Sequence, residues 1–165
     1  MDHDGALIRA EIEALNVEFW YRVDHRNGEG VADLFCEDGV YSVTGGRNAG
    51  RAAIAASYVA RAARGPRVSR HVHSNLRVTV ISPTEARGLS MLTLWARDGE
   101  APMSIAMPVS VSDVRDEYAC SEDGVWRIRH RHISPAFLGD EPAVLPFAPN
   151  PATAPALDHH ESREG

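Results

Sequence analysis

The chain has 165 residues, of which 44% are hydrophobic and 24% are charged, and this length and composition exclude a disordered protein and favour one globular domain. The formal net charge of -6 comes without a basic stripe or tail, which argues against nucleic acid as a partner. The widely spaced Cys36 and Cys120 indicate neither a disulfide framework nor a zinc site. No run of about 18 apolar residues suggests a membrane span, so we expect a soluble, cytoplasmic protein.

The first 66 residues carry three helical patterns. Apolar residues recur at steps of four, three and four in residues 7–23, which predicts an amphipathic helix with Ile8, Ile12, Leu15 and Phe19 on one face. A short second helix is predicted over Val31–Phe35, ending at a turn over residues 37–39. The alanine-rich stretch over residues 51–64 predicts a third helix, which ends at Gly65-Pro66.

The rest of the chain has the pattern of β-strands. A short strand is expected at residues 41–43, and four longer β-rich runs are separated by turn signals, over residues 68–81, 86–96, 103–120 and 125–133. Helices first and strands afterwards predict an α+β domain with three N-terminal helices packed on one face of a curved, mainly antiparallel sheet. We place this domain at residues 1–134. The proline-rich segment 135–165 is expected to be an irregular tail that partly packs over the pocket or a neighbouring subunit, with a disordered end.

The run Arg70–Val78 contains the most informative polar residues. Strand geometry sends alternate side chains to opposite faces, which predicts that His71, His73 and Asn75 share one face. If that face points beneath the helices, these groups need partners or a ligand, because a buried unpaired polar group is costly. The alternative is that one histidine makes a core hydrogen bond while the other is solvated at a strand edge.

Asp24 lies at the end of the first helical pattern, next to its apolar face. A carboxylate there can accept a hydrogen bond from a histidine ring, fix the tautomer of the ring and strengthen it as a base. The alternative is a solvated or capping aspartate.

The run Trp126–Ile133 is a third candidate. Simple alternation puts Trp126, Ile128, His130 and His132 on one face and three arginines on the other. Arg131 could bind a developing negative charge or a leaving group, although alternating arginines are more often an exposed face.

No metal or nucleotide motif accompanies the eight histidines. Asp24, His71 and His73 could form a facial triad for iron, but no further ligand pattern supports it. Gly45-Gly46 lacks the context of a phosphate-binding loop. We therefore expect no metal and no cofactor.

Over residues 5–140 the chain resembles the SnoaL-like branch of the nuclear-transport-factor-2-like superfamily, in which three helices cover a curved sheet to form a cone. The resemblance rests on the order of several short matches: Phe19 to Arg26, Leu34-Phe35, Asp38 to Tyr41, Gly50 to Ile54, His71 with Asn75, and Gly124 to Ile128 before Arg131. Within that superfamily the chain is most similar to hexachlorocyclohexane dehydrochlorinase and to scytalone and bile-acid dehydratases.

The resemblance implies an Asp–His dyad, formed here by Asp24 and His71, with Arg131 as a third catalytic residue. It also implies a closed, largely apolar pocket, to which we assign Phe19, Trp20, Tyr21, Tyr41, His73 and Asn75 as substrate-binding residues. Phe19 departs from the pattern, because the dehydrochlorinase has a lysine at this position and the bile-acid enzymes have a tyrosine. A chlorinated substrate is therefore not implied.

Three functions fit these residues. The first is a cofactor-independent lyase of the dehydratase or dehydrohalogenase type, acting on a small, largely apolar cyclic molecule. The second is an isomerase or polyketide cyclase that uses the same base. The third is a non-catalytic small-molecule-binding module or the small subunit of a ring-hydroxylating oxygenase, because a fold alone does not define a function. A homodimer or homotrimer is expected, since the outer face of the sheet needs cover.

Overall fold

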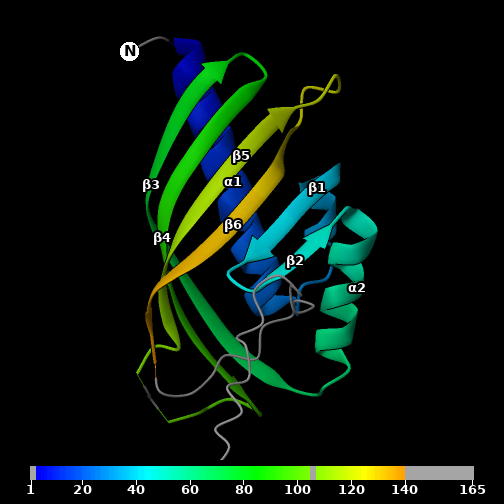
Figure 1. The fold of residues 1–165 in the computed structure, drawn as a ribbon, viewed down its shortest axis with the longest axis vertical. Coiled ribbons are helices and arrows are strands. Elements are labelled where there is room, and N and C mark those ends of the chain that lie inside the picture. The colour runs from blue at the N-terminus through cyan, green and yellow to red at the C-terminus, as the bar shows by residue number, and fades with distance from the viewer. Residues whose placement is uncertain (1–2, 105–106, 140–165) are drawn as a thin grey trace, which may run out of the picture.

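Helix α1 (His3–His25) is the longest helix in the described residues and runs along one side of a curved sheet (Figure 1). A computed structural model describes residues 3–104 and 107–139. The predicted stripe is confirmed, since Ile12, Leu15 and Phe19 are buried together with Val23. Apolar residues spaced by three or four positions lie on one face of a helix, so this face packs on the sheet and carries Asp24 with it.

The predicted second helix is only a single 3-10 turn, η1 (Val31–Leu34), so the expectation of three α-helices was wrong within the described residues. The chain extends into β1 (Phe35–Val43) directly after η1, and the expected turn over residues 37–39 lies inside this strand. Four residues are too few for an α-helical hydrogen-bond ladder, so this segment forms one 3-10 turn. This turn buries Val31 and Ala32. Helix α2 (Arg51–Ala62) agrees closely with the prediction.

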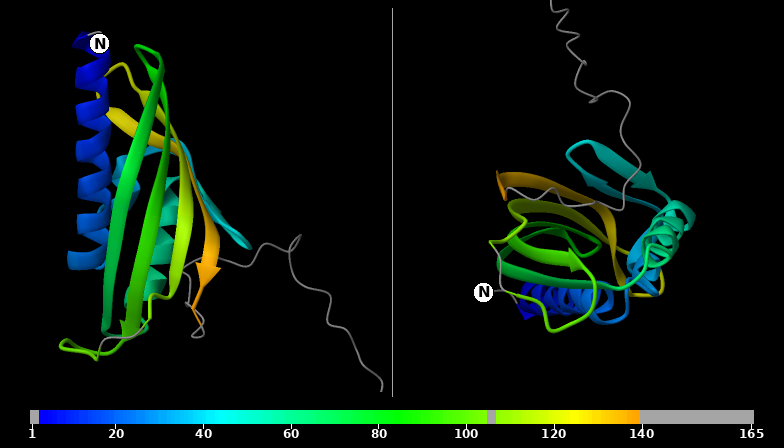
Figure 2. Two further views of the ribbon diagram at one scale, coloured as in Figure 1. Left: turned by 90° about the vertical axis from the view of Figure 1, so that its left-hand side faces the viewer. Right: turned by 90° about the horizontal axis from the view of Figure 1, so that it is seen from below.

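The sheet has six strands in the order β2-β1-β6-β5-β4-β3, and all neighbouring pairs are antiparallel except β1 with β6. The strand β2 (Gly46–Ala49) was not predicted and forms a hairpin with β1. The long strands are β3 (Arg67–Ser82), β4 (Glu85–Asp98), β5 (Ser110–Cys120) and β6 (Trp126–Leu138). Helix α1 covers one side of this sheet, while α2 flanks the β1–β2 hairpin (Figure 2).

Two β-bulges change which side chains face the core. In β3 the register with β4 gains one residue between Ser74 and Arg77, where Asn75 has a left-handed φ of 55°. In β6 the register with β5 gains Arg129 between Ile128 and His130. An extra residue inverts the alternation of side chains beyond it. In β3 the shared face of His71 and His73 is therefore confirmed, and only the placement of Asn75 with them was wrong. In β6 the bulge separates His130 and His132 from Trp126 and Ile128, so the single-face assignment of these four residues was wrong.

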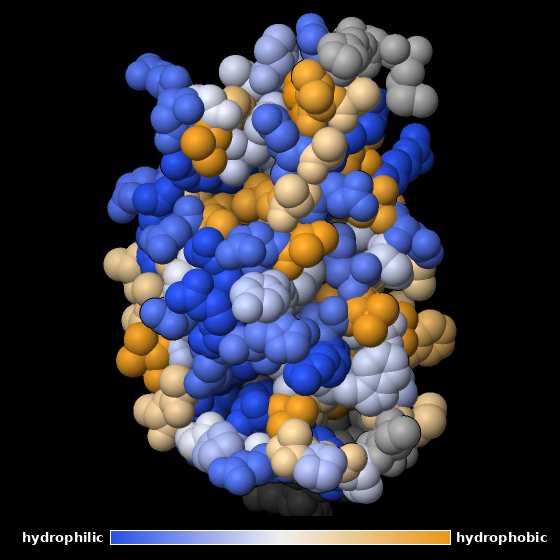
Figure 3. Space-filling view, turned by 180° about the vertical axis from the view of Figure 1, so that it is seen from behind, coloured by the Kyte–Doolittle hydropathy of each residue, from blue (hydrophilic) through white to orange (hydrophobic). Residues whose placement is uncertain are grey.

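Strand β6 continues through Pro135 to Leu138, although the sequence pattern predicted an irregular tail from residue 135. Pro135 is accommodated next to a register shift, where a ladder hydrogen bond is already missing. The expected packing of the proline-rich tail falls on residues 140–165 and lies outside the described residues. No helix in the described part of the chain is long and apolar enough to cross a membrane. Seen from behind, the molecule shows mostly hydrophilic side chains with scattered hydrophobic ones (Figure 3).

Gly28 sets the close approach of the end of α1 to α2, and replacing it with alanine tests this. The Gly28 φ is +85°, and an added Cβ would lie 2.0 Å from the buried Tyr58 ring. Gly28→Ala should lower the free energy of unfolding by about 2–4 kcal/mol, combining backbone strain and overpacking. Urea denaturation measures this loss.

The matched control is Gly124→Ala, because Gly124 also has a positive φ of +74°, but no heavy atom of the described residues lies within 4 Å of the new Cβ. It carries only the strain of the left-handed backbone, about 1–2 kcal/mol. Equal losses in the two variants would contradict a steric role for the Gly28–Tyr58 contact.

Candidate active site

Asp24, in the last turn of α1, is held by strand β3 through three hydrogen bonds. The Asp24 Oδ2 atom accepts the backbone N–H of His71 at 2.7 Å, and Oδ1 accepts the Ser69 hydroxyl at 2.8 Å and His71 Nδ1–H at 2.6 Å. The Asp24 side chain is only 7% exposed. Burial raises the pKa of this carboxyl, but the hydrogen bonds from His71 and Ser69, together with the charge attraction that the His71 ring exerts when it is protonated, outweigh burial and hold the pKa below its ordinary value.

His71 is oriented by this carboxylate and by a stacked indole. An ionised carboxylate only accepts hydrogen bonds, so Nδ1 of His71 carries the proton and Nε2 carries a lone pair. The Trp20 ring is stacked on the imidazole with centroids 4.6 Å apart and planes 20° apart. No described side chain bonds to Nε2, so this atom is placed to accept a proton.

His73 lies on the same face as His71, as predicted, and is neutral near pH 7. Its Nε2 is 2.6 Å from the Ser90 hydroxyl, and its ring lies 6.1 Å from the Trp20 ring. Burial, together with repulsion from Arg131, lowers the pKa of His73 to about 4. His73 therefore adds a polar but uncharged group beside the dyad.

Arg131 is fully buried and belongs to a closed ring of four side chains. Its guanidinium donates from Nε to Asp116 Oδ1 at 2.9 Å and from Nη2 to Asp116 Oδ2 at 2.7 Å, and Nη2 also donates to Asn16 Oδ1. The Asn16 amide donates to the Tyr118 hydroxyl at 2.9 Å, which donates to Asp116 at 2.7 Å. Burial opposes the charge of Arg131, but Asp116 more than compensates and raises the pKa of Arg131.

Two buried donors next to the dyad have no hydrogen-bond partner among the described residues. These are the Trp20 Nε1–H and the Arg131 Nη1–H groups. The Arg131 guanidinium carbon lies 5.3 Å from the centroid of the Trp20 ring, so both donors belong to one neighbourhood. Buried donors without partners are rare in proteins and mark places where a ligand atom or water is expected.

Aromatic side chains complete this neighbourhood. Phe19 is fully buried, and its ring packs edge-to-face against Trp20 at 4.7 Å and Tyr41 at 5.7 Å. The Arg131 guanidinium lies 4.2 Å from the Phe19 centroid, within the range of a cation–π contact. Phe19 therefore supports Arg131, and Tyr41 is buried beside it with its hydroxyl bonded to Tyr58.

Two residues of the predicted set lie elsewhere. Tyr21 is 51% exposed and stacks on His25, because it occupies the solvent side of α1. Asn75 is exposed at the bulge of β3, where its amide contacts the Met91 sulfur at 3.4 Å. The structure thus groups Asp24, His71, His73 and Arg131 with Phe19, Trp20 and Tyr41, but not with Tyr21 or Asn75.

Five polar residues of the site were missed by sequence reasoning. Ser69 lies two residues before His71 in β3 and shares its face. Asp116 and Tyr118 follow the buried Val114 at two-residue spacing in β5 and share its face, so strand periodicity contained a signal for all three. Ser90 in β4 and Asn16 in α1 required knowledge of which elements face each other.

The described residues contain no cluster of three or more His, Cys, Asp or Glu side chains that could hold a metal ion. The iron triad considered from the sequence has no support in this geometry, because Nδ1 of His71 is bonded to Asp24 and Nε2 of His73 lies beside Ser90. What the arrangement offers chemically is a buried base with its orienting carboxylate, next to two hydrogen-bond donors.

Residues 5–132 match the SnoaL-like domain family, and the chain belongs to this family. This match covers the dyad, the Arg131 ring of side chains and all strands except the end of β6. No curated protein matches the chain.

Solved structures support the same fold, which is that of nuclear-transport-factor-2-like proteins. A candidate scytalone dehydratase from Novosphingobium aromaticivorans has a TM-score of 0.73 at 22% identity, with 93% of this chain and 99% of that chain covered. A type 2 hexachlorocyclohexane dehydrochlorinase (LinA) has a TM-score of 0.71 at 22% identity, with 90% and 98% covered. The protein ActVI-ORFA from Streptomyces coelicolor has a TM-score of 0.68 at 20% identity, with 78% and 98% covered.

The hydrogen bonds on Asp24 predict how stability depends on pH. A carboxyl whose pKa is lowered on folding stabilises the native state above its unfolded-state pKa, and the contribution is lost as the pH falls through the folded-state pKa. We expect Asp24→Asn to lower the free energy of unfolding by about 1–3 kcal/mol near neutral pH. The difference from wild type should shrink as the pH falls below the ordinary value of 3.8.

Urea denaturation at several pH values from neutral to acid measures this difference. The control is Asp33→Asn, which changes an exposed aspartate of η1 and should cost little at neutral pH. A difference between Asp24→Asn and wild type that stays constant or grows on acidification would contradict stabilisation by the ionised carboxylate.

Proposed function

We propose that the protein is a cofactor-independent lyase of the dehydratase or dehydrohalogenase type, in which His71 is the general base and Asp24 orients it. The observation that carries the proposal is the 2.6 Å hydrogen bond between His71 Nδ1 and Asp24 Oδ1, which leaves Nε2 as the proton acceptor. The similarity to dehydratase and dehydrochlorinase structures supports the same reaction class. The substrate is a small, largely apolar cyclic molecule.

In the proposed reaction, Nε2 of His71 takes a proton from a carbon next to an activated position. The C–H electron pair forms a double bond, and the adjacent C–O or C–halogen bond breaks with its electrons on the leaving group. The imidazolium is stabilised by Asp24, which keeps its charge. For a hydroxyl leaving group the imidazolium returns the proton and water departs, whereas for a halide the proton is released to solvent.

Arg131 and Trp20 are proposed to bind the oxygen or halogen that gains negative charge. Their free Nη1–H and Nε1–H groups are buried, so they need no reorganisation to donate to this atom. Asp116 and Asn16 fix the other guanidinium nitrogens, which leaves Nη1 as the donor toward substrate. The ion pair with Asp116 also makes this part of the site neutral, which suits an uncharged substrate.

The exposed apolar side chains of β3 and β4 support the proposal of a homodimer or homotrimer. Val72, Leu89 and Met91 are each more than 40% exposed on these two strands. Association that covers them would remove apolar surface from water. We propose that the assembly forms in the cytoplasm and that each subunit carries its own dyad.

An isomerase or polyketide cyclase would use the same base, and the masses of the products separate these reactions. We propose to identify small molecules that co-purify with the native full-length protein by mass spectrometry, and to test them with cyclic β-hydroxy ketones and hexachlorocyclohexane as probes. Loss of water or hydrogen halide marks elimination, while an unchanged mass marks isomerisation or cyclisation. A bound compound that stays unaltered would instead support the binding module.

Substitution of either dyad residue should nearly abolish turnover. His71→Gln removes the base and Asp24→Asn removes its orienting charge, so kcat should fall by about 10²–10⁴-fold in each. Steady-state kinetics on the compound turned over by the wild type measures this, with circular dichroism to confirm the fold. His25→Gln is the control, because His25 is next to Asp24 in sequence but exposed. Unchanged turnover in either dyad variant rejects the mechanism.

Trp20→Phe tests the proposed donor role of the indole. Phenylalanine keeps an aromatic ring against His71 but lacks the N–H group, so we expect kcat/KM to fall about tenfold, the worth of one hydrogen bond to a charged atom. Trp95→Phe, on the exposed side of β4, should leave kcat/KM unchanged. Equal kcat/KM in Trp20→Phe and wild type would show that Nε1–H does not contact the reacting molecule.

A further inference from the structure

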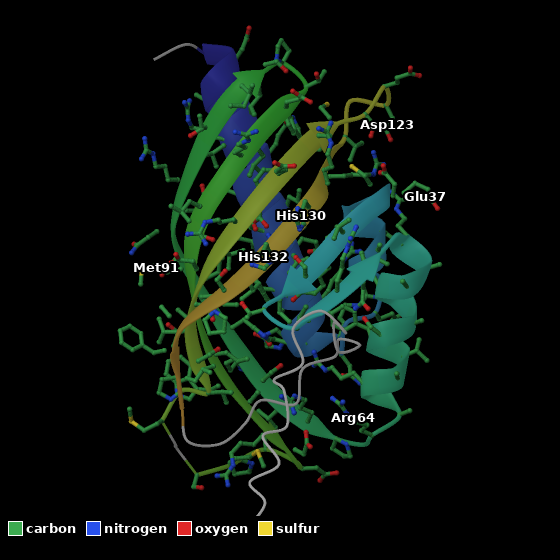
Figure 4. The ribbon with its side chains drawn as sticks, viewed as in Figure 1. Glu37, Arg64, Met91, Asp123, His130 and His132 are labelled. Atoms are coloured by element: carbon green, nitrogen blue, oxygen red, sulfur yellow. The ribbon has the colours of Figure 1, made fainter. Side chains whose placement is uncertain are left out.

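A second cluster of imidazoles lies on the opposite face of the sheet from the dyad. The Ser42 hydroxyl of β1 is 2.8 Å from His132 Nδ1 and 3.1 Å from His130 Nε2, both on β6 (Figure 4). The two rings have centroids 6.3 Å apart and planes tilted by 59°. Two ring nitrogens from alternate strand positions therefore converge on one oxygen.

The bulge at Arg129 creates this arrangement. It turns Arg131 into the core, so its neighbours His130 and His132 point to the outer face, where both are partly exposed. The parallel pairing of β1 with β6 places Ser42 opposite His132 and Val40 opposite His130. The Ser42 side chain is thus 7% exposed although it faces outward, because the two rings cover it.

We propose that His130 and His132, with the Ser42 hydroxyl between them, bind a borderline divalent transition metal ion, Cu²⁺ or Zn²⁺. Neutral imidazole nitrogen suits both ions, and Cu²⁺ binds more tightly than Zn²⁺ to the same donors. Metal–nitrogen distances for such ions are about 2.0–2.1 Å. Water molecules complete the coordination, since the site supplies two nitrogens and one oxygen.

The positions of the hydroxyl and ring protons in this cluster are compatible with metal binding. Ser42 has one hydroxyl proton, which can go to the Arg131 carbonyl oxygen at 3.3 Å or to one ring nitrogen. At least one of the two facing ring nitrogens therefore carries a proton in the metal-free protein. On binding, each neutral ring holds its proton on the nitrogen that faces away from the ion, so no net proton release from the rings is required.

The charges near the cluster are of both signs: burial lowers the pKa of His132, and repulsion from His130 and Arg115 lowers it further. On β5, Arg115 pairs in register with His132, but its guanidinium is bound to Asp113 at 3.1 Å. Glu117 pairs in register with His130 and contributes a further carboxylate to this face. On β5 this face thus has two carboxylates and one guanidinium, while Arg87 of β4 lies 3.9 Å from Glu117 and Arg47 of β2 pairs in register with Ser42. The donor atoms, and not a net negative charge, are therefore what would hold the ion.

An ion at this site would join β1 to β6 directly behind Arg131 and Tyr41, which lie opposite each other in the same register. Binding to the native state alone stabilises that state in proportion to the logarithm of the ion concentration. Metal binding is therefore expected to raise the thermal midpoint of the protein. It requires no change in the dyad, which lies across the sheet.

The test uses the full-length chain without a polyhistidine tag and with Cu²⁺ or Zn²⁺ chloride as the probe. Titration calorimetry should show one site per chain that is tighter for Cu²⁺, and the Cu²⁺ electron paramagnetic resonance spectrum should show two imidazole nitrogens. His130→Gln and His132→Gln keep a hydrogen-bonding side chain near Ser42 and should each remove one nitrogen and weaken binding by more than about tenfold. The metal-induced rise in thermal midpoint should be lost in both.

The control variant is His159→Ala with His160→Ala, which removes two histidines that are adjacent in the sequence and outside the proposed site. It should keep the affinity and the two-nitrogen spectrum of the wild type. Binding that survives in both His130→Gln and His132→Gln, or that disappears in the control, would overturn the proposed site. Absence of any Cu²⁺ binding by the folded wild type would overturn it as well.

Discussion

The site depends on one carboxylate that joins the end of a helix to a strand. Asp24 accepts three hydrogen bonds from Ser69 and His71, so the end of α1 cannot shift along β3 without breaking all three. The same bonds determine which nitrogen of His71 carries a proton. The same hydrogen bonds therefore hold α1 against β3 and orient His71 as the base, and the Trp20 ring stacked on His71 supports both.

The second half of the site is a buried cation, Arg131, whose loss of hydration is offset by neighbouring side chains in the core. Arg131 has its charge balanced by Asp116 and its geometry set by Asn16 and Tyr118, all within the core. Buried ion pairs stabilise little by themselves, since desolvation offsets the attraction. We infer that this pair holds one rigid N–H group next to the base, without a partner among the described residues, where the proposed elimination would use it.

Much of the fold could be predicted, because helix periodicity and strand composition are local properties. The stripe of α1, the long strands and the order of elements all follow from them, and the resemblance to a family pointed to Asp24, His71 and Arg131. The face of Arg131 could not be predicted by alternation, since the bulge at Arg129 depends on pairing with β5. The same holds for Asn75, and for Asn16, whose side-chain partners Tyr118 and Arg131 lie more than one hundred residues away.

The most direct test of the dyad is the tautomer of His71, read by ¹⁵N NMR of the imidazole nitrogens in the uniformly labelled protein near neutral pH. The resonances are assigned by their disappearance in a His71→Gln sample. We predict that His71 of the wild type has a proton on Nδ1 and none on Nε2. In Asp24→Asn we predict that the two nitrogen resonances become similar, because the ring exchanges between its two tautomers. A proton on Nε2 with a bare Nδ1 in the wild type would contradict the hydrogen bond on which the proposed function depends.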